Sequence, residues 1–237
     1  MTPLLPTATT TEERQRNAQV AILPVGSFEQ HGDYLPLSTD TIVATLIARQ
    51  IADTYPVMLL PPVTISCSHE HSAWPGTVSI SARTLHAIVT DVYDSVTRSG
   101  PAALIVINGH GGNYVLSNVV QEANAEGRHM ALFPSREDWN EARAAAQLTS
   151  SMHEDMHAGE LETSLLLHAC PEVIRPGYQS ADWIADDRRH LLTKGMQAYT
   201  DSGVIGRPSL ATAEKGKALL DSLTNSFADV LDLFTKS

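Results

Sequence analysis

The chain has 237 residues, of which 43% are hydrophobic, and this is enough to bury a full core in one domain. Its 16 basic and 27 acidic residues give a net charge of −11, which argues against nucleic acid or an anionic membrane as a partner. Two cysteines are too few for a disulfide framework, and no apolar segment is long enough to span a membrane, so we expect free thiols and a cytoplasmic location.

Residues 1–18 begin with a Pro/Thr-rich stretch and are expected to form a partly irregular extension, followed by a single domain over residues 19–237. Within the domain, short apolar runs alternate with segments of helical periodicity. The predicted strands cover residues 20–25, 57–65, 103–107 and 130–133. The predicted helices cover residues 40–52, 81–98, 113–127, 161–169 and 213–234. Such alternation requires crossover connections, so we predict a three-layer α/β/α fold with a mainly parallel sheet.

Some residues modify this outline locally. The Pro61–Pro62 pair places the second strand at an edge of the sheet or bends it, and Asp40 could cap the first helix. Trp139 and Trp183 lie in polar stretches that we expect to be irregular, where either ring could sit on a lid or pack on the surface.

Histidines and carboxylates gather in three short segments that contain glycine. These are residues 29–32 with Asp40 close behind, residues 108–113 and residues 157–164. Glycine lets the backbone turn sharply, and two of the three segments directly follow predicted strands. Ligands bind beyond the carboxyl ends of the strands in folds of this kind. The pattern therefore predicts a hydrolytic metal site.

The residue types are consistent with that prediction. Glu29 and His31 project to the same side if their segment is extended, and Asp40 could bridge two ions with its two oxygens. A mixed set of imidazoles and carboxylates suits Zn, Mn or Fe. Two ions about 3.5–4 Å apart would activate a water and polarise a carbonyl in one site. A solvated charge or a structural histidine explains any one of these residues alone, but explains the three segments together poorly.

The same segments resemble the creatininase (creatinine amidohydrolase) family. The resemblance runs in the family's order through residues 23–32, 35–41, 70–77, 108–113, 157–164 and 211–216. It implies two divalent ions per chain, Zn with Zn, Mn or Fe, bridged by Asp40, and a homo-oligomer that is a hexamer. It implies that His157 shuttles a proton to the departing nitrogen, as an imidazole can near neutral pH. The metal ligands that it implies are Glu29, His31, Asp40 and His110.

One departure from the family pattern concerns position 112. Creatininase has a glutamate ligand two residues after the Asn-Gly-His histidine, where this chain has Gly112. Glu162 is our candidate replacement and Glu160 the second, although a carboxylate stabilised by a helix N-terminus is the structural alternative. Relatives with Gly-Gly after this histidine include formamide hydrolases of flavin-type cofactor pathways and peptidases that trim the mycofactocin precursor peptide.

From these features we predict a divalent-metal-dependent amidohydrolase that cleaves an amide, cyclic amide or formamide C–N bond, other than an ordinary peptide bond, in a small polar substrate. A peptidase of the mycofactocin-maturation type is the alternative, and a catalytically silent binding subunit is the non-enzyme alternative. Glu70, His71 and Trp74 are candidate substrate contacts, although packing or structural hydrogen bonds explain them equally well. The chain has no Gly-x-Ser-x-Gly motif of a serine hydrolase and no glycine pattern of a nucleotide site.

Overall fold

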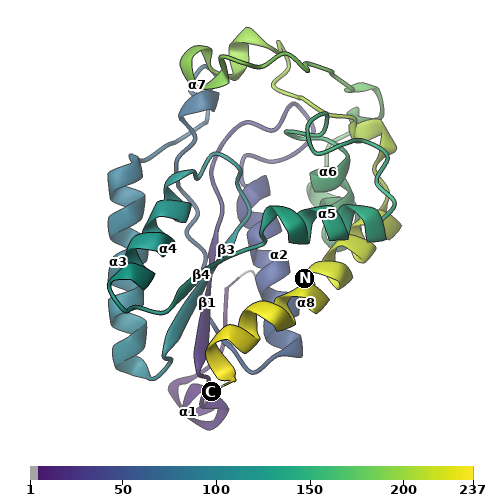
Figure 1. Ribbon diagram of the computed structural model, residues 1–237. Coiled ribbons are helices and arrows are strands. Elements are labelled where there is room, and N and C mark those ends of the chain that lie inside the picture. The colour runs from purple at the N-terminus through teal and green to yellow at the C-terminus, as the bar shows by residue number, and fades with distance from the viewer. Residues whose placement is uncertain (1–4, 237) are drawn as a thin grey trace.

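The computed structural model describes residues 5–236, which form a four-stranded parallel sheet with helices on both faces (Figure 1). The strand order is β2-β1-β3-β4, and each neighbouring pair is parallel. The strands are β1 (Val20–Val25), β2 (Met58–Leu59), β3 (Ala103–Asn108) and β4 (Met130–Phe133). The predicted three-layer α/β/α fold with a mainly parallel sheet is confirmed.

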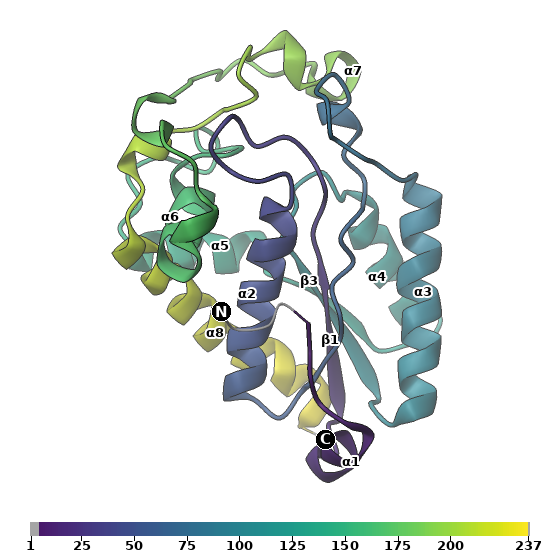
Figure 2. The same cartoon turned by 180° about the vertical axis from the view of Figure 1, so that it is seen from behind.

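Helices α2, α5, α6 and α8 cover one face of the sheet, and α3 and α4 cover the other (Figures 1 and 2). The helices are α1 (Thr10–Arg16), α2 (Thr39–Thr54), α3 (Ala82–Ser99), α4 (Val115–Ala125), α5 (Arg136–Ala145), α6 (Glu160–Ala169), α7 (Leu191–Lys194) and α8 (Ala213–Thr235). Successive strand residues point to opposite faces, so Ile22 and Ile105 join the core under α2 and α8, whereas Leu23 and Val106 join the core under α3 and α4. Apart from Asn108 at the end of β3, the two central strands are apolar, as is typical of strands that are buried on both faces.

The predicted strand over residues 57–65 is wrong in length. Only Met58–Leu59 form a strand, because Pro61 and Pro62 have no N–H to donate to a ladder. The chain still follows β1, since Leu60 N donates to Ile22 O at 3.0 Å and Val63 N to Pro24 O at 2.9 Å. Its predicted place at an edge of the sheet is confirmed by the strand order.

Three helices were not expected from the sequence, namely α1, α5 and the four-residue α7. Helix α1 lies within the N-terminal extension and begins with a capping box between Thr9 and Glu12. Helix α5 begins with another between Ser135 and Asp138, so the expectation of an irregular stretch around Trp139 is wrong. Residues 1–4 of the extension lie outside the described residues. Both cysteines are free, and no helix within residues 5–236 is both long and apolar enough to cross a membrane.

Two glycines bring the ends of β1 and β3 against the start of α2. A Cβ atom on Gly26 would lie 2.3 Å from the Cα of Thr41, and one on Gly109 would lie 2.5 Å from the carbonyl oxygen of Asp40. Only a residue without a side chain permits either approach. The loops that follow the two strands therefore meet around the first turn of α2, where Asp40 lies.

Candidate metal centre

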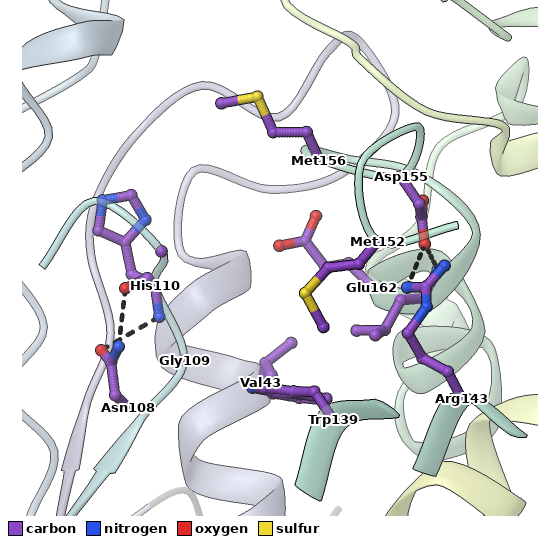
Figure 3. Close-up of a pocket in the computed structure, with 12 residues that line it drawn as sticks. Val43, Asn108, Gly109, His110, Trp139, Arg143, Met152, Asp155, Met156 and Glu162 are labelled. Atoms are coloured by element: carbon purple, nitrogen blue, oxygen red, sulfur yellow. Dashed lines mark hydrogen bonds and ion pairs between the residues drawn. The ribbon is translucent and has the colours of Figure 1, made fainter. Parts of the chain in front are cut away.

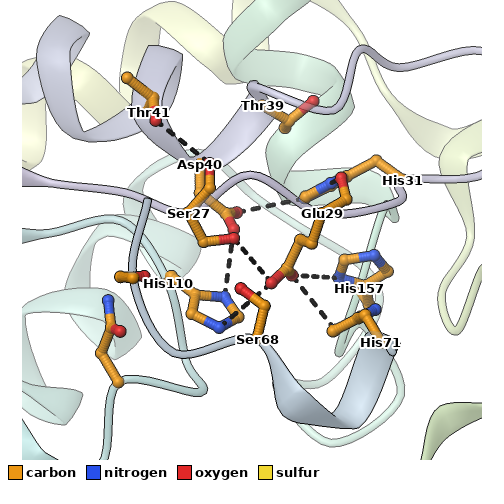
Figure 4. Close-up of polar contacts among 12 residues, drawn as sticks. Ser27, Glu29, His31, Thr39, Asp40, Thr41, Ser68, His71, His110 and His157 are labelled. Atoms are coloured by element: carbon orange, nitrogen blue, oxygen red, sulfur yellow. Dashed lines mark hydrogen bonds and ion pairs between the residues drawn. The ribbon is translucent and has the colours of Figure 1, made fainter. Parts of the chain in front are cut away.

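Four histidines and three carboxylates meet beyond the carboxyl ends of β1 and β3. Figure 4 shows all of them except Glu162, which is drawn in Figure 3. They come from the loop after β1, the first turn of α2, a 3-10 turn at residues 69–71, the turn after β3, and the start of α6 with the loop before it. The seven residues are Glu29, His31, Asp40, His71, His110, His157 and Glu162. All are buried except Glu162, whose side chain is 17% exposed. The cluster thus contains every residue that the sequence singled out as a ligand or proton shuttle except Glu160, the second candidate for the missing ligand.

Asp40 lies at the middle of this cluster. Its Oδ1 is 3.1 Å from Nε2 of His31, and its Oδ2 is 3.1 Å from Nδ1 of His110. Ser38, not Asp40, occupies the N-cap position of α2, so the idea that Asp40 caps this helix is wrong. Each carboxylate oxygen instead faces a different imidazole, which is the arrangement that a bridging carboxylate needs.

Glu29 faces three histidines from the loop after β1. Its Oε2 accepts a hydrogen bond from the Ser27 hydroxyl at 2.6 Å and lies 3.3 Å from Nε2 of His110. Its Oε1 lies 3.1 Å from Nε2 of His71 and 3.8 Å from Nδ1 of His157. Glu29 therefore lies between His110 on one side and the rings of His71 and His157 on the other (Figure 4).

Backbone carbonyls fix the orientation of three rings. Each ring donates one N–H to a carbonyl oxygen, from Nδ1 in His31 and from Nε2 in His110 and His157. The acceptors are the carbonyl oxygens of Glu29 at 3.0 Å, Cys67 at 2.8 Å and Gln30 at 2.6 Å, respectively. A nitrogen that donates to a carbonyl carries the proton, so the other nitrogen of each neutral ring offers its lone pair. In all three rings that nitrogen faces a carboxylate of the cluster.

The cluster fits divalent cations. Glu29 Oε1 and Asp40 Oδ2 are buried and accept no hydrogen bond from the described residues, which is costly for ionised oxygens unless a cation compensates. Potential ligand atoms lie within 4.8 Å of one another in three sets of residues. These sets are Glu29–Asp40–His110, His31–Asp40–Glu162 and Glu29–His31–His157. The first two share Asp40, so together they could hold two ions with one bridging carboxylate.

Without a cation, protons compensate the buried carboxylates. Burial, and then the Asp40 charge, raises the pKa of Glu29 to about 8. Burial acts to lower the pKa of His110, but Glu29 and Asp40 outweigh it and raise that pKa to about 10. His31 behaves similarly, since Asp40 and Glu162 outweigh burial and raise its pKa well above the usual value. Cations would have to displace these protons, so metal binding should weaken as the pH falls.

His157 and His71 stay neutral at pH 7. Burial, followed by the charge of His31, lowers the pKa of His157 to about 4. Burial also lowers the pKa of His71, and the neighbouring histidines lower it further. The two rings lie close together, with centroids 4.4 Å apart.

The two glutamates at the start of α6 point to different surroundings. Oε1 of Glu162 lies 3.8 Å from Nε2 of His31, and its Oε2 accepts from the backbone N–H of Ala158 at 2.6 Å. Glu160 instead pairs with Lys215 Nζ at 2.5 Å and accepts from the backbone N–H of Ser150 at 3.0 Å. Glu162 belongs to one of the three ligand sets and Glu160 to none among the described residues.

Of the predicted substrate contacts, His71 is part of the cluster, whereas Glu70 and Trp74 lie beside it. Glu70 Oε1 is 3.6 Å from Nε2 of His110 and fills the space next to Gly112, where an added Cβ would lie 2.0 Å from it. His71 is buried against Glu29, and the ring of Trp74 lies 6.4 Å from that of His71. Their contact with a substrate stays a prediction.

A cavity of about 300 Å³ opens beside His110 and Glu162 (Figure 3). An ion pair of 3.0 Å between Arg143 and Asp155 forms part of its wall. The apolar lining consists of Val43, Trp139, Met152, Met156 and Leu161. The sequence singled out only Trp139 among these residues. Met152 and Met156 belong to no sequence motif that would mark them as lining residues. Arg143 lies in helix α5, which was not predicted, so its position could not be predicted either.

Comparisons with known proteins identify the family of this chain. The sequence profile of the creatininase family, described as creatinine amidohydrolase, matches residues 6–231. The mycofactocin precursor peptide peptidase of Mycobacterium ulcerans (strain Agy99) is 34% identical over 224 residues, which are 89% of this chain and 81% of that protein.

Solved structures share the fold. The structure of a proposed creatinine amidohydrolase from Bacteroides fragilis NCTC 9343 has a TM-score of 0.80 at 24% identity, covering 98% of this chain and 95% of that one. A zinc–zinc form of a mutant creatininase has a TM-score of 0.79 at 20% identity, covering 96% of both chains.

Proposed function

The chain belongs to the creatininase family of hydrolases, and on that premise we propose that it cleaves a carbon–nitrogen bond with the help of two divalent metal ions. The observation that carries this proposal is the position of Asp40, whose two oxygens face two different imidazoles in two ligand sets. The buried oxygens Glu29 Oε1 and Asp40 Oδ2, which accept no hydrogen bond within residues 5–236, support the same proposal.

We assign the residues of the cluster as follows. Glu29, Asp40 and His110 would hold one ion, and His31, Asp40 and Glu162 would hold the other. When bound, the ions would supply Lewis acidity and lower the pKa of a water. Imidazole and carboxylate donors favour Zn, Mn or Fe, and the zinc–zinc relative is consistent with zinc at both positions.

His157 would carry the proton. Its Nε2–H is tied to the carbonyl of Gln30, so only Nδ1 is free, and that atom faces Glu29 at 3.8 Å. Nδ1 would take a proton from the attacking water and give it to the nitrogen as the C–N bond breaks. Burial of the ring keeps bulk water from competing for that proton.

A short peptide is the substrate class that we favour. The 34% identity to a precursor peptide peptidase supports a peptide, as does the apolar lining of the cavity, which suits a side chain next to the scissile bond. A small polar amide, cyclic amide or formamide is the second candidate, because the matching family is described as creatinine amidohydrolase. The homo-oligomer, a hexamer by resemblance, and the cytoplasmic location remain predictions.

Metal analysis and a substrate screen test this function. Protein purified without chelator should contain close to two divalent ions per chain, and chelation should abolish hydrolysis until Zn²⁺ or Mn²⁺ is returned. The screen should compare creatinine, formamidopyrimidines and short peptides that differ in one side chain. Hydrolysis that persists without metal would refute the metal-dependent function, whereas turnover restricted to creatinine or a formamide would reject the peptide.

A further inference from the structure

His71 differs from the other three histidines of the cluster in its hydrogen bonding. His31, His110 and His157 each donate one ring N–H to a backbone carbonyl. Nδ1 of His71 instead lies 2.9 Å from the side-chain nitrogen Nε2 of Gln30. The proton on His71 therefore depends on which way the Gln30 amide points.

Two backbone groups fix the Gln30 amide. Its Oε1 accepts from the N–H of Gly32 at 3.0 Å, and its Nε2 donates to the carbonyl oxygen of Gly203 at 3.1 Å. If the amide were flipped, its NH₂ group would face the N–H of Gly32 and its oxygen would face the carbonyl oxygen of Gly203. Both hydrogen bonds would then be lost. Gly203 has φ +88°, and a Cβ there would lie 1.8 Å from Gln30 Oε1, so this contact also requires glycine.

The tautomer of His71 follows from this orientation. The second hydrogen of Gln30 Nε2 points to His71 Nδ1, which must therefore be an acceptor without a proton. The ring proton is then on Nε2, which lies 3.1 Å from Oε1 of Glu29. Glu29 Oε1 accepts no hydrogen bond from the described residues, so this N–H acts on the carboxylate through its partial charge and the oxygen can still bind a cation.

We propose that His71 is a positioning residue that presents an Nε2–H to the Glu29 carboxylate, with Gln30 setting its tautomer. It is not itself a metal ligand. In agreement, His71 belongs to none of the ligand sets found among the described residues, although it lies as close to Glu29 as His110 does. The proposal rests on the metal site proposed above and gives His71 a role separate from the predicted contact with substrate.

The role matters because Glu29 belongs to two of the three ligand sets. The Ser27 hydroxyl holds one of its oxygens and His71 faces the other. Groups that hold a ligating carboxylate in this way typically change metal affinity about 10–100-fold when removed.

Histidine side-chain NMR tests the tautomer directly. Two-bond ¹H–¹⁵N correlation spectra should be recorded for the metal-free and the Zn²⁺-loaded chain, with the His71 signals assigned by their loss in His71→Gln. We expect His71 to be protonated at Nε2 and unprotonated at Nδ1 in both states. Protonation at Nδ1 in the metal-free chain would overturn the assigned tautomer, and loss of the Nε2 proton when Zn²⁺ binds would indicate that His71 is a ligand; either result would overturn the proposal.

Competition between the protein and a chromogenic chelator for Zn²⁺ tests the positioning role. His71→Leu should bind Zn²⁺ about 10–100-fold more weakly. His71→Gln retains an N–H near the Nε2 position and should recover most of the affinity. His69→Gln changes an exposed histidine of the same 3-10 turn and should match the unmodified chain. Equal affinity in His71→Leu would reject the role, whereas an unmodified chain that binds no Zn²⁺ would reject the proposed metal site but not the tautomer.

Discussion

The Glu162 carboxylate lies 3.8 Å from Nε2 of His31, although the two residues come from distant parts of the sequence. The start of α6 is held in place by Asp155, which accepts from the backbone N–H groups of Glu160 at 2.6 Å and Leu161 at 3.0 Å. Asp155 in turn is paired with Arg143 at 3.0 Å. Gly112 offers no side chain to the cluster. Glu162 on α6 brings a carboxylate to it instead.

Asp40→Ala should release at least one ion per chain and abolish hydrolysis. The remaining groups cannot hold two dications close together against their mutual repulsion once the shared carboxylate is gone. Metal content by mass spectrometry, measured together with turnover, checks this. Full occupancy and activity in Asp40→Ala would show that Asp40 does not bridge.

Glu162→Gln should weaken one metal site and leave the other occupied, because the ion loses both a bond and a neutralising charge. Calorimetric titration of the metal-free variant with Zn²⁺ measures this. Two unchanged sites would remove Glu162 from the ligand set.

Glu160→Gln is the matched control at the same helix end. It should keep both metal sites but destabilise the fold by about 2–3 kcal/mol, because it breaks the buried pair with Lys215. Burial acts to raise the pKa of Glu160, but Lys215 and Ser150 outweigh it and lower that pKa below 4.5. This stabilisation is therefore present above pH 4.5 and is lost as the pH falls through the lower native pKa. Denaturant unfolding across this range checks the effect, and a lost metal site would contradict it.

His157→Ala should keep its metal and lose roughly 10²–10⁴-fold in kcat, the usual contribution of a positioned acid or base. His157 could instead be a metal ligand, because Glu29, His31 and His157 form the third ligand set. Metal content and kcat measured on the same preparation distinguish them. If both fall together, the proton-shuttle role is wrong.

Gly112→Ala should weaken Zn²⁺ binding about tenfold or more, since the new Cβ would lie 2.4 Å from Nε2 of His110 and 2.0 Å from Oε1 of Glu70. Gly111→Ala is the control, because a Cβ there meets no atom within 4 Å. Chelator competition on both variants makes the comparison. Equal affinities would mean that Glu70 moves aside without disturbing His110.

Met152→Lys should reduce the preference for peptides with a large apolar side chain about tenfold or more in kcat/KM, because a charge enters the apolar cavity. Peptide pairs that differ only in that side chain provide the measurement. An unchanged ratio would indicate that the cavity does not receive the side chain.

The sequence by itself determined the layers of the fold and pointed to Glu29, His31, Asp40, His110 and His157 as a common site, but it left Glu160 and Glu162 as alternatives. Apolar runs such as residues 103–107 are buried on both sides, and this requires a sheet covered by helices. Glycines after the strands marked where imidazoles and carboxylates would collect, because a sharp turn at a strand end needs a small residue.

Only the tertiary structure decided which atoms face one another. The choice between Glu160 and Glu162 at the cluster depended on Lys215, which α8 brings to the first of them. The tautomer of His71 depended on Gly203, a distant residue that fixes the Gln30 amide. Local sequence encodes backbone turns and periodicity, whereas the direction and protonation of a buried polar group depend on partners that only folding brings into contact.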